Sequence, residues 1–187
     1  MKLKNIVGIN VGQNVSRIKD KEDKVSRIYT NEDLLNDLHE KHIGLVRKTK
    51  IGTARNEKYF IYAGDILYSF ISSTAGIVSQ ENDGKIINQN FARLTLNTKE
   101  IDPRYLCYVL NESISVDKQM SILMQGSVVP KMTPAILSEI NIEFPELSKQ
   151  LEIGNSYFDL NRYYYLSKIE IELQKKTHFE ILKKLDQ

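Results

Sequence analysis

The sequence predicts an α+β protein: a mixed, β-rich domain with short helices over residues 1–145, followed by one long C-terminal helix over 146–187 that pairs with a partner helix. Three observations lead to this fold class. Runs rich in β-branched and aromatic residues alternate with turn signals over roughly the first hundred residues. Two helix starts marked by proline follow, and the segment from Leu147 to the C-terminus contains no proline at all.

Strand signals dominate the first part of the chain. Residues 61–71 are dense in β-branched and aromatic side chains around a Gly64-Asp65 turn. Residues 75–80 and 86–87 flank Asn82-Asp83-Gly84, and because Asn and Gly tolerate the positive φ of a tight turn, we expect a β-hairpin here. From Phe91 to Asn97, apolar residues alternate with mainly polar ones, which predicts a further strand with one buried face.

Helix signals follow from residue 102. Asp102-Pro103 combines an N-cap residue with proline at the first helical position, and a second helix is expected over residues 116–124, ending at Gly126. Thr133-Pro134 repeats the capping device before a short helical turn over residues 135–138. The apolar residues of the segment 140–144 alternate with polar ones, which predicts a strand that Pro145 ends.

The C-terminal segment has the pattern of a long amphipathic helix. About 38 helical residues at about 1.5 Å each give a rod of roughly 57 Å. A lone monomer would leave its apolar stripe in water, so we expect pairing with a partner helix; a helix folded back on its own domain is the alternative. The residues predicted to form the pairing surface are Leu151, Phe158, Leu160, Tyr164, Leu166, Ile169, Leu173, Ile181 and Leu185.

Charge and composition narrow the class of protein. The formal net charge is only +2, but six basic residues and one acidic residue, Glu57, lie between Lys41 and Lys58. Such a patch suits phosphate contacts, with a solvated basic loop as the alternative. No apolar run reaches the roughly 18 residues of a membrane span, and no secretory signal is recognisable, so we expect a cytoplasmic protein without a membrane segment.

Near-matches to catalytic motifs have simpler explanations. Asp102-Pro103-Arg104-Tyr105 is one residue from the Asp-Pro-Pro-Tyr motif of amino-methyltransferases, but no glycine-rich cofactor loop accompanies it, and helix capping accounts for it. Asp65 followed by Asp83-Gly84-Lys85 has the outline of a metal-dependent nuclease site, although a turn is the better use of Asp83-Gly84.

The remaining reactive side chains are isolated. His39, His42 and His178 are scattered, with no third ligand or general base beside them, and surface positions are expected. The single cysteine, Cys107, lies in an apolar helix, where a buried, inert thiol is expected. The sequence therefore predicts no catalytic centre, no metal site and no cofactor.

A series of segments in fixed order resembles the target recognition domain of type I restriction–modification specificity subunits. These are residues 64–69 (GDILYS), 88–94 (NQNFARL), 103–110 (PRYLCYVL), Gly126-Ser127 and 136–153 (ILSEINIEFPELSKQLEI). The usual member is about twice this length, with two recognition domains and two long helices. The resemblance is therefore to the half-subunits that pair to rebuild the two-domain arrangement.

The resemblance implies a function without catalysis by this chain. The domain would read one half of a bipartite site in double-stranded DNA, and paired helices would set the spacing of the half-sites. The implied partners are a second copy or another half-subunit, a modification methyltransferase subunit and, through it, the restriction subunit. A dimeric scaffold or decoy that binds the modification subunit without reading DNA is the alternative, and the metal-dependent nuclease is another.

Contacts to DNA are assigned from charge and from hydrogen-bonding side chains near predicted turns. Phosphate contacts are expected from Arg47, Lys48, Lys50, Arg55 and Lys58. Base contacts are expected from Gln13, Asn14, Arg17, Ser69, Ser72, Ser73, Thr74, Gln125, Ser127 and Lys131. Each serine or asparagine in this set also has an alternative use as a turn residue.

Overall fold

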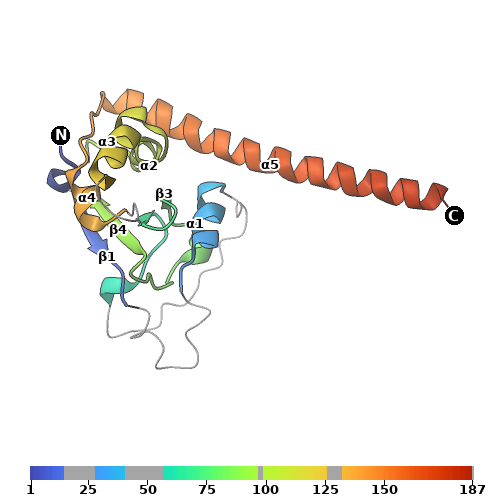
Figure 1. The fold of residues 1–187 in the computed structure, drawn as a ribbon, viewed down its shortest axis with the longest axis horizontal. Helices are drawn as coiled ribbons and strands as arrows, with labels where there is room; N and C mark the ends of the chain where they lie inside the picture. The colour runs from blue at the N-terminus through green and yellow to red at the C-terminus, as the bar shows by residue number, and fades with distance from the viewer. Residues whose placement is uncertain (15–27, 41–56, 97–98, 126–131, 187) are drawn as a thin grey trace.

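A four-stranded antiparallel sheet, short helices packed around it and one projecting helix make up the protein (Figure 1). The computed structural model describes residues 1–14, 28–40, 57–96, 99–125 and 132–186. The elements are η1 (Leu3–Asn5), β1 (Val7–Val11), α1 (Asn31–Leu38), η4 (Glu57–Tyr59), β2 (Ile66–Ser69), β3 (Thr74–Ile77), η5 (Gln80–Asn82), β4 (Phe91–Leu96), α2 (Pro103–Glu112), α3 (Ile114–Met124), α4 (Pro134–Glu139) and α5 (Leu147–Leu185). The predicted α+β class is confirmed, and the elements from η1 to α4 are called the body below.

The sheet has the strand order β1-β4-β2-β3, and its strand β2 is buried on both faces. Side chains of a strand point alternately to opposite faces, and here neighbouring residues of β2 join different apolar clusters. Tyr68 belongs to the larger cluster, which α2 and α3 help to form, whereas Leu67 belongs to a smaller cluster with Leu34 of α1. The strand expected from Phe91 is confirmed as β4, although Phe91 itself is buried in the smaller cluster.

The predicted helix starts are confirmed down to their capping bonds. The Asp102 carboxylate accepts a hydrogen bond from the Tyr105 backbone N–H at 2.8 Å. The Thr133 hydroxyl accepts one from the Ile136 N–H at 3.2 Å. Both caps satisfy backbone donors that the first helical turn leaves without partners. The Asp-Pro-Arg-Tyr sequence is therefore a helix start, as its capping interpretation predicts.

The β-hairpin predicted around Asn82-Asp83-Gly84 is wrong. Gly84 has the expected positive φ of 76°, but η5 precedes it, and Ile86 forms only isolated bridges with Ile28 and Phe60. The hairpin in this region joins β2 to β3 through residues 70–73. Its turn contains no glycine or asparagine, and Ser73 takes the left-handed conformation with φ 52°.

The strand predicted over residues 140–144 is also wrong. Ile140 and Ile142 are buried and Asn141 is exposed, so the alternation itself is real. The Asn141 backbone, however, pairs with the Gln119 side chain, which donates to the Asn141 carbonyl at 2.9 Å and accepts from its N–H at 2.8 Å. Only one isolated bridge, to Lys2, joins this segment to another backbone.

A buried polar cluster ties α1 to η5. The Asp37 carboxylate accepts hydrogen bonds from the Tyr29 hydroxyl and from the Asn82 side-chain amide, each at 2.7 Å. Burial raises the pKa of Asp37, although these donors act in the opposite direction. Asp37 lies in the last turn of α1, so these hydrogen bonds fix the position of that end of the helix. The same end of α1 lies beside α5.

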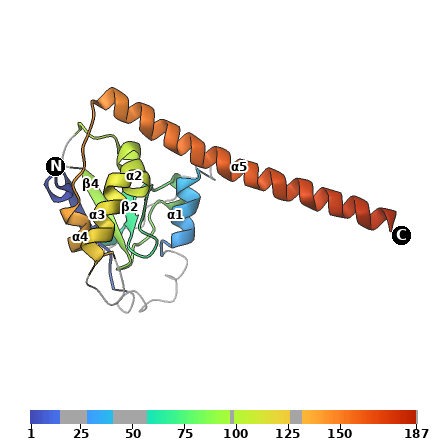
Figure 2. The same ribbon diagram turned by 45° about the horizontal axis from the view of Figure 1, so that its top comes forward.

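The long helix is confirmed as α5, which has 39 residues and a length of about 58 Å. Only its first turns are buried, at Gln150, Gly154, Tyr157 and Phe158, and the remainder extends away from the body (Figure 2). The helix is therefore not folded back on the body along its length. None of the helices in the described part of the chain is long and apolar enough to cross a membrane.

Candidate functional site

Strand register brings three separate segments to one end of the sheet. Val11 pairs with Ala92, Ser69 pairs with Phe91, and Ser69 also pairs with Thr74. Because these strands are antiparallel, the segments beyond those pairs all lie at the same end of the sheet. We call this region the sheet-end surface; its members are Gln13, Asn14, Ile71, Ser72, Ser73, Thr74, Asn88, Gln89 and Asn90.

Backbone hydrogen bonds hold the sheet-end surface together. The Gln13 N–H donates to the Ile87 carbonyl at 3.0 Å, and the Ile87 N–H donates to the Tyr59 carbonyl at 3.1 Å. A Cβ at Gly12 would lie 2.2 Å from the Asn88 carbonyl oxygen, so only glycine permits this close approach. Lys58 precedes Tyr59 and is exposed, with its ammonium 5.8 Å from the centre of the Tyr59 ring. A basic side chain therefore lies beside the polar surface.

The turn between β2 and β3 separates the predicted serines into two groups. Ser69 is fully buried: its hydroxyl donates to the Asn31 side chain at 2.7 Å and accepts from the Ile71 and Ser72 N–H groups. Ser69 therefore shapes the turn, and the structure contradicts its assignment as an exposed base contact. Ser72 is exposed at the tip beside Ile71, whose side chain is 61 % exposed.

The other predicted contacts divide by location. Gln13, Asn14, Ser72, Ser73 and Thr74 are brought together at the sheet-end surface, whereas Gln125 is the exposed C-cap residue of α3. The predicted contacts that lie outside the described residues are Arg47, Lys48, Lys50, Arg55, Arg17, Ser127 and Lys131.

Sequence reasoning missed four members of the sheet-end surface. Asn88, Gln89 and Asn90 form a run of three amide side chains just before β4, and Ile71 is the exposed apolar residue of the turn. Amide groups offer a donor and an acceptor together, which is the pattern that base edges present. The run of amides was the available signal; nothing in the sequence marked Ile71 as exposed.

The acidic residues of the nuclease hypothesis serve the fold. The Asp65 carboxylate accepts from the Tyr62 N–H at 2.9 Å and lies 3.6 Å from the Arg93 guanidinium, whereas Asp83 accepts from the Ala63 N–H at 2.9 Å. Lys85 pairs with Asp33 at 2.9 Å instead of standing at a solvated tip. Within the described ranges, no group of three or more histidine, cysteine or acidic side chains is arranged to hold a metal.

The cysteine and the described histidines also show no arrangement for catalysis. Cys107 is fully buried, and burial raises the pKa of its thiol, which disfavours the reactive thiolate. The His39 ring stacks on Tyr165 with centroids 5.4 Å apart and an interplanar angle of 9°. His178 is exposed on α5, as expected, and His42 lies outside the described residues.

The outer part of α5 carries the second candidate surface. Most of the residues predicted to form the pairing surface are exposed; Leu160 is 64 % and Leu173 is 59 % exposed. Phe158 is the exception, because it is buried in the body's core and is therefore not available to a partner. The exposed members, called the α5 stripe, are Leu151, Leu160, Tyr164, Leu166, Ile169, Leu173, Ile181 and Leu185.

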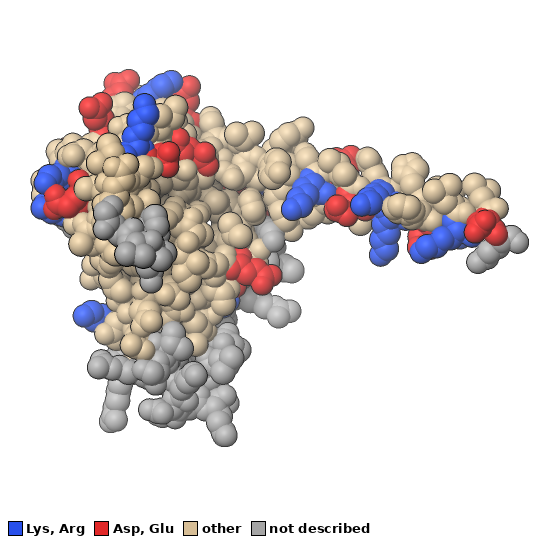
Figure 3. All heavy atoms as spheres, in the orientation of Figure 1, with Lys and Arg blue, Asp and Glu red and all other residues tan. Residues whose placement is uncertain are grey.

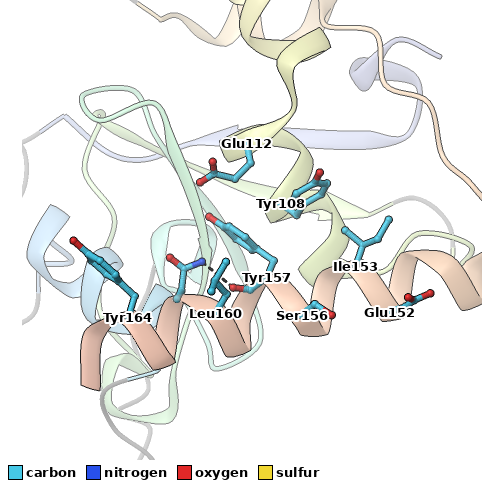
Figure 4. Close-up of a pocket in the computed structure, with 9 residues that line it drawn as sticks. Tyr108, Glu112, Glu152, Ile153, Ser156, Tyr157, Leu160 and Tyr164 are labelled. Carbon is cyan, nitrogen blue, oxygen red and sulfur yellow. Dashed lines mark hydrogen bonds between the residues drawn. The ribbon is translucent and has the colours of Figure 1, made fainter. Parts of the chain in front are cut away.

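Two grooves flank α5 where it leaves the body. The first, of about 610 Å³, lies between α2 and α5; Tyr108 and Glu112 face Leu160 and Tyr164 across it (Figure 4). Tyr157 lies at its floor, where its hydroxyl accepts from the Asn111 amide at 2.9 Å and burial raises its pKa to about 12. The second, of about 600 Å³, lies between α1 and α5. Both grooves are continuous with the α5 stripe through Tyr164.

Charges of both signs are interspersed along α5 on the face drawn in Figure 3. Two intrahelical ion pairs, Lys149–Glu152 and Lys183–Glu180, have N–O distances of 2.8 Å. Such a helix exposes large apolar side chains among charges of both signs, and exposed apolar surface of this kind favours contact with a partner.

Comparison with known proteins identifies relatives of this arrangement. A family model described as "Type I restriction modification DNA specificity domain" matches residues 1–187. The fold is similar to the HsdS subunit of Thermoanaerobacter tengcongensis, with a TM-score of 0.52 at 16 % identity, covering 89 % of this chain and 38 % of that one. No curated protein sequence gives a significant match.

Two further solved structures share the fold. The S subunit of a type I restriction–modification system from M. genitalium gives a TM-score of 0.55 at 16 % identity, covering 93 % of this chain and 42 % of that one. A chain from a structural study of the type I R-M system gives 0.59 at 16 % identity, covering 97 % and 42 %. The present chain thus spans about two fifths of the length of these relatives.

Proposed function

Because the chain belongs to the family of type I restriction modification DNA specificity domains, we propose that it reads one half of a bipartite DNA target and directs partner subunits to it. The observation that carries this proposal is the separation of two surfaces: a polar sheet-end surface on the body, and an apolar stripe on a helix that projects from it. One surface suits DNA contact and the other suits assembly. The chain itself supplies no catalytic step; methylation and cleavage belong to the partner methyltransferase and restriction subunits.

Base reading is assigned to the sheet-end surface. Ser72 offers a hydroxyl group, Gln13 and Gln89 offer amides, and Ile71 offers an apolar contact of the kind that a thymine methyl group accepts. The strands next to these segments are paired in the sheet, so the backbone positions of these residues are defined before DNA binds. Lys58 beside this surface contributes a phosphate contact, and the basic residues between Arg47 and Arg55 are proposed to extend it.

Pairing of two α5 helices is the proposed basis of the bipartite target. The α5 stripe leaves large apolar side chains in water, and burying them against a second such helix would stabilise the pair by about 25 cal/mol for each Å² of apolar area. The second helix comes from a second copy or from another specificity half. Two identical halves related by twofold symmetry would read inverted half-sites.

Methylation mapping tests this function. The chain is co-expressed with a modification subunit in cells that lack other methyltransferases, and methylated positions are mapped by sequencing. We expect a bipartite motif that disappears when the chain is omitted and when Leu166, Ile169 and Leu173 are all replaced by Glu. Methylation of the same motif without the chain would contradict the proposal. A chain that co-purifies with the modification subunit but leaves methylation unchanged would identify a scaffold or decoy instead.

A further inference from the structure

The direction of α5 depends on a few contacts at its base. The Gln150 side chain accepts from the Asp102 N–H at 3.0 Å, and Gly154 lies so close to α2 that a Cβ would be 2.6 Å from the Tyr105 nitrogen. About 27 residues follow Phe158, a lever of about 40 Å. A tilt of about 10° at the base would move the far end by about 7 Å, which is about two base-pair steps of 3.4 Å.

Arg104 joins three elements at this base. Its guanidinium donates to the Glu40 carboxylate at 2.8 Å and to the Asn155 side-chain oxygen at 3.4 Å, and it lies 5.0 Å from the centre of the Phe158 ring. Glu40 follows α1, Arg104 belongs to α2, and the other two residues belong to α5. Both charged side chains are at most about one-third exposed, so water weakens this ion pair less than one at the open surface.

Glu40 occupies its position against the preference of the backbone. Its φ is 45°, in the left-handed region just beyond the end of α1, where glycine or asparagine is usual because a side chain is strained there. Backbone strain at a single residue persists only where the surrounding contacts hold that residue in place. Here the carboxylate of Glu40 is the group that reaches Arg104.

A second contact lies further along α5. His39, the C-cap residue of α1, stacks on Tyr165, two turns beyond Phe158. The end of α1 therefore contacts α5 directly through His39 and indirectly, through Arg104, at Asn155 and Phe158 (Figures 1 and 2). Two contact points separated along a helix restrict its tilt, whereas one contact would act as a pivot.

We propose that Arg104, held between Glu40 and the α5 residues Asn155 and Phe158, is a positioning residue that sets the direction of α5 and thereby the half-site spacing that the assembly accepts. The link to spacing rests on the proposed function; the link to helix direction does not. Glu40→Gly is the informative variant, because glycine suits the backbone at this position while the ion pair is lost. Glu152→Gln is its matched control, because it removes an ion pair of equal N–O distance that lies wholly within α5.

Helix direction is measured with spin labels on cysteines introduced at Ser121 of α3 and Lys175 of α5. Cys107 is buried and does not compete for the label. Labelled full-length chain is mixed with an excess of unlabelled chain, so that only distances within one chain are recorded. We expect Glu40→Gly to broaden the distance distribution by about 5 Å or more and Glu152→Gln to leave it unchanged. Arg104→Lys keeps the charge but not the flat guanidinium over Phe158, so it should give an intermediate width.

Half-site spacing is measured as methylation of targets whose spacer is lengthened or shortened by one or two base pairs. Glu40→Gly should accept these altered spacers about tenfold better than wild type, with unchanged preference for the bases within each half-site. Equal distance distributions for Glu40→Gly and wild type would overturn the positioning role, and a broadened distribution with unchanged spacer preference would overturn the link to spacing. A wild-type chain that directs no methylation would contradict the proposed function instead, and the distance measurement, which needs no DNA, would still decide the role of Arg104.

Discussion

Gln150 is buried where α5 meets the body, and its replacement by leucine isolates the contribution of its hydrogen bonds. The side chain is 2 % exposed. It accepts from the Asp102 N–H at 3.0 Å and donates to the Glu100 and Pro145 carbonyls at 3.0 and 2.8 Å. Leucine has a similar size but makes none of these bonds, so three backbone groups lose their partner.

The expected loss of stability follows from those three bonds. Each contributes about 1 kcal/mol, and leucine recovers part of the sum through apolar burial, so we expect Gln150→Leu to lower the free energy of unfolding by about 2–3 kcal/mol. Urea denaturation followed by tyrosine fluorescence measures this, at one fixed protein concentration because pairing would make stability depend on concentration. Gln174→Leu, at an exposed position of α5, is the control and should change stability by less than about 0.5 kcal/mol. A loss below about 0.5 kcal/mol for Gln150→Leu would refute the reasoning.

Three further predictions concern helix pairing, the buried cluster and the helix base. Leu173→Glu places a charge in the α5 stripe and should weaken self-association at least about tenfold in sedimentation; a change of under twofold would count against the stripe. Burial raises the pKa of Asp37 in the folded state, so the wild type gains stability as the pH falls through that pKa toward the ordinary value of 3.8. The stability advantage of the wild type over Asp37→Asn in urea denaturation should therefore be larger at pH 4.5 than at pH 7. A smaller advantage at pH 4.5 would contradict the raised pKa. Gly154→Ala should lower the free energy of unfolding by about 1–2 kcal/mol, because crowding against α2 outweighs the better helix propensity of alanine; a stabilised variant would show that α5 shifts freely.

Local signals in the sequence predicted local structure well. Asp102-Pro103 and Thr133-Pro134 start helices because capping involves only neighbouring residues. The absence of proline after Pro145 predicted α5, because helical hydrogen bonds join residues four apart and so follow from the local sequence.

Features that depend on distant partners were misread. The segment around Asn141 alternates like a strand, but Asn141 pairs with the Gln119 side chain and its neighbours with the backbone of Met1 and Leu3, partners that no periodicity reveals. Phe158 follows the same spacing as the α5 stripe, yet it is buried in the body because only the first turns of α5 pack against the other elements. The observed hairpin turn has Ser73 in the left-handed conformation, which serine does not usually adopt and which the sequence therefore did not predict.

The candidate site could be predicted only in part for the same reason. Gln13, Ser72 and Asn88 are far apart in the sequence and meet because the antiparallel register brings their segments to one end of the sheet. Ser69 has the residue type of a base contact, but its hydroxyl is used inside the turn. Residue type alone therefore selects candidates, and strand register decides which of them share a surface.

The most direct test of the sheet-end surface is selection of bound DNA from a random pool. The full chain, with its partner subunits, is compared with the same assembly carrying Gln89→Ala or Ser72→Ala, two exposed positions of this surface. The account predicts that each variant changes the preferred base at one or two positions of the half-site, at about 1–3 kcal/mol for each lost contact, while general affinity at low salt is retained. Recovery of an identical motif by wild type and both variants would contradict the claim that this end of the sheet reads DNA.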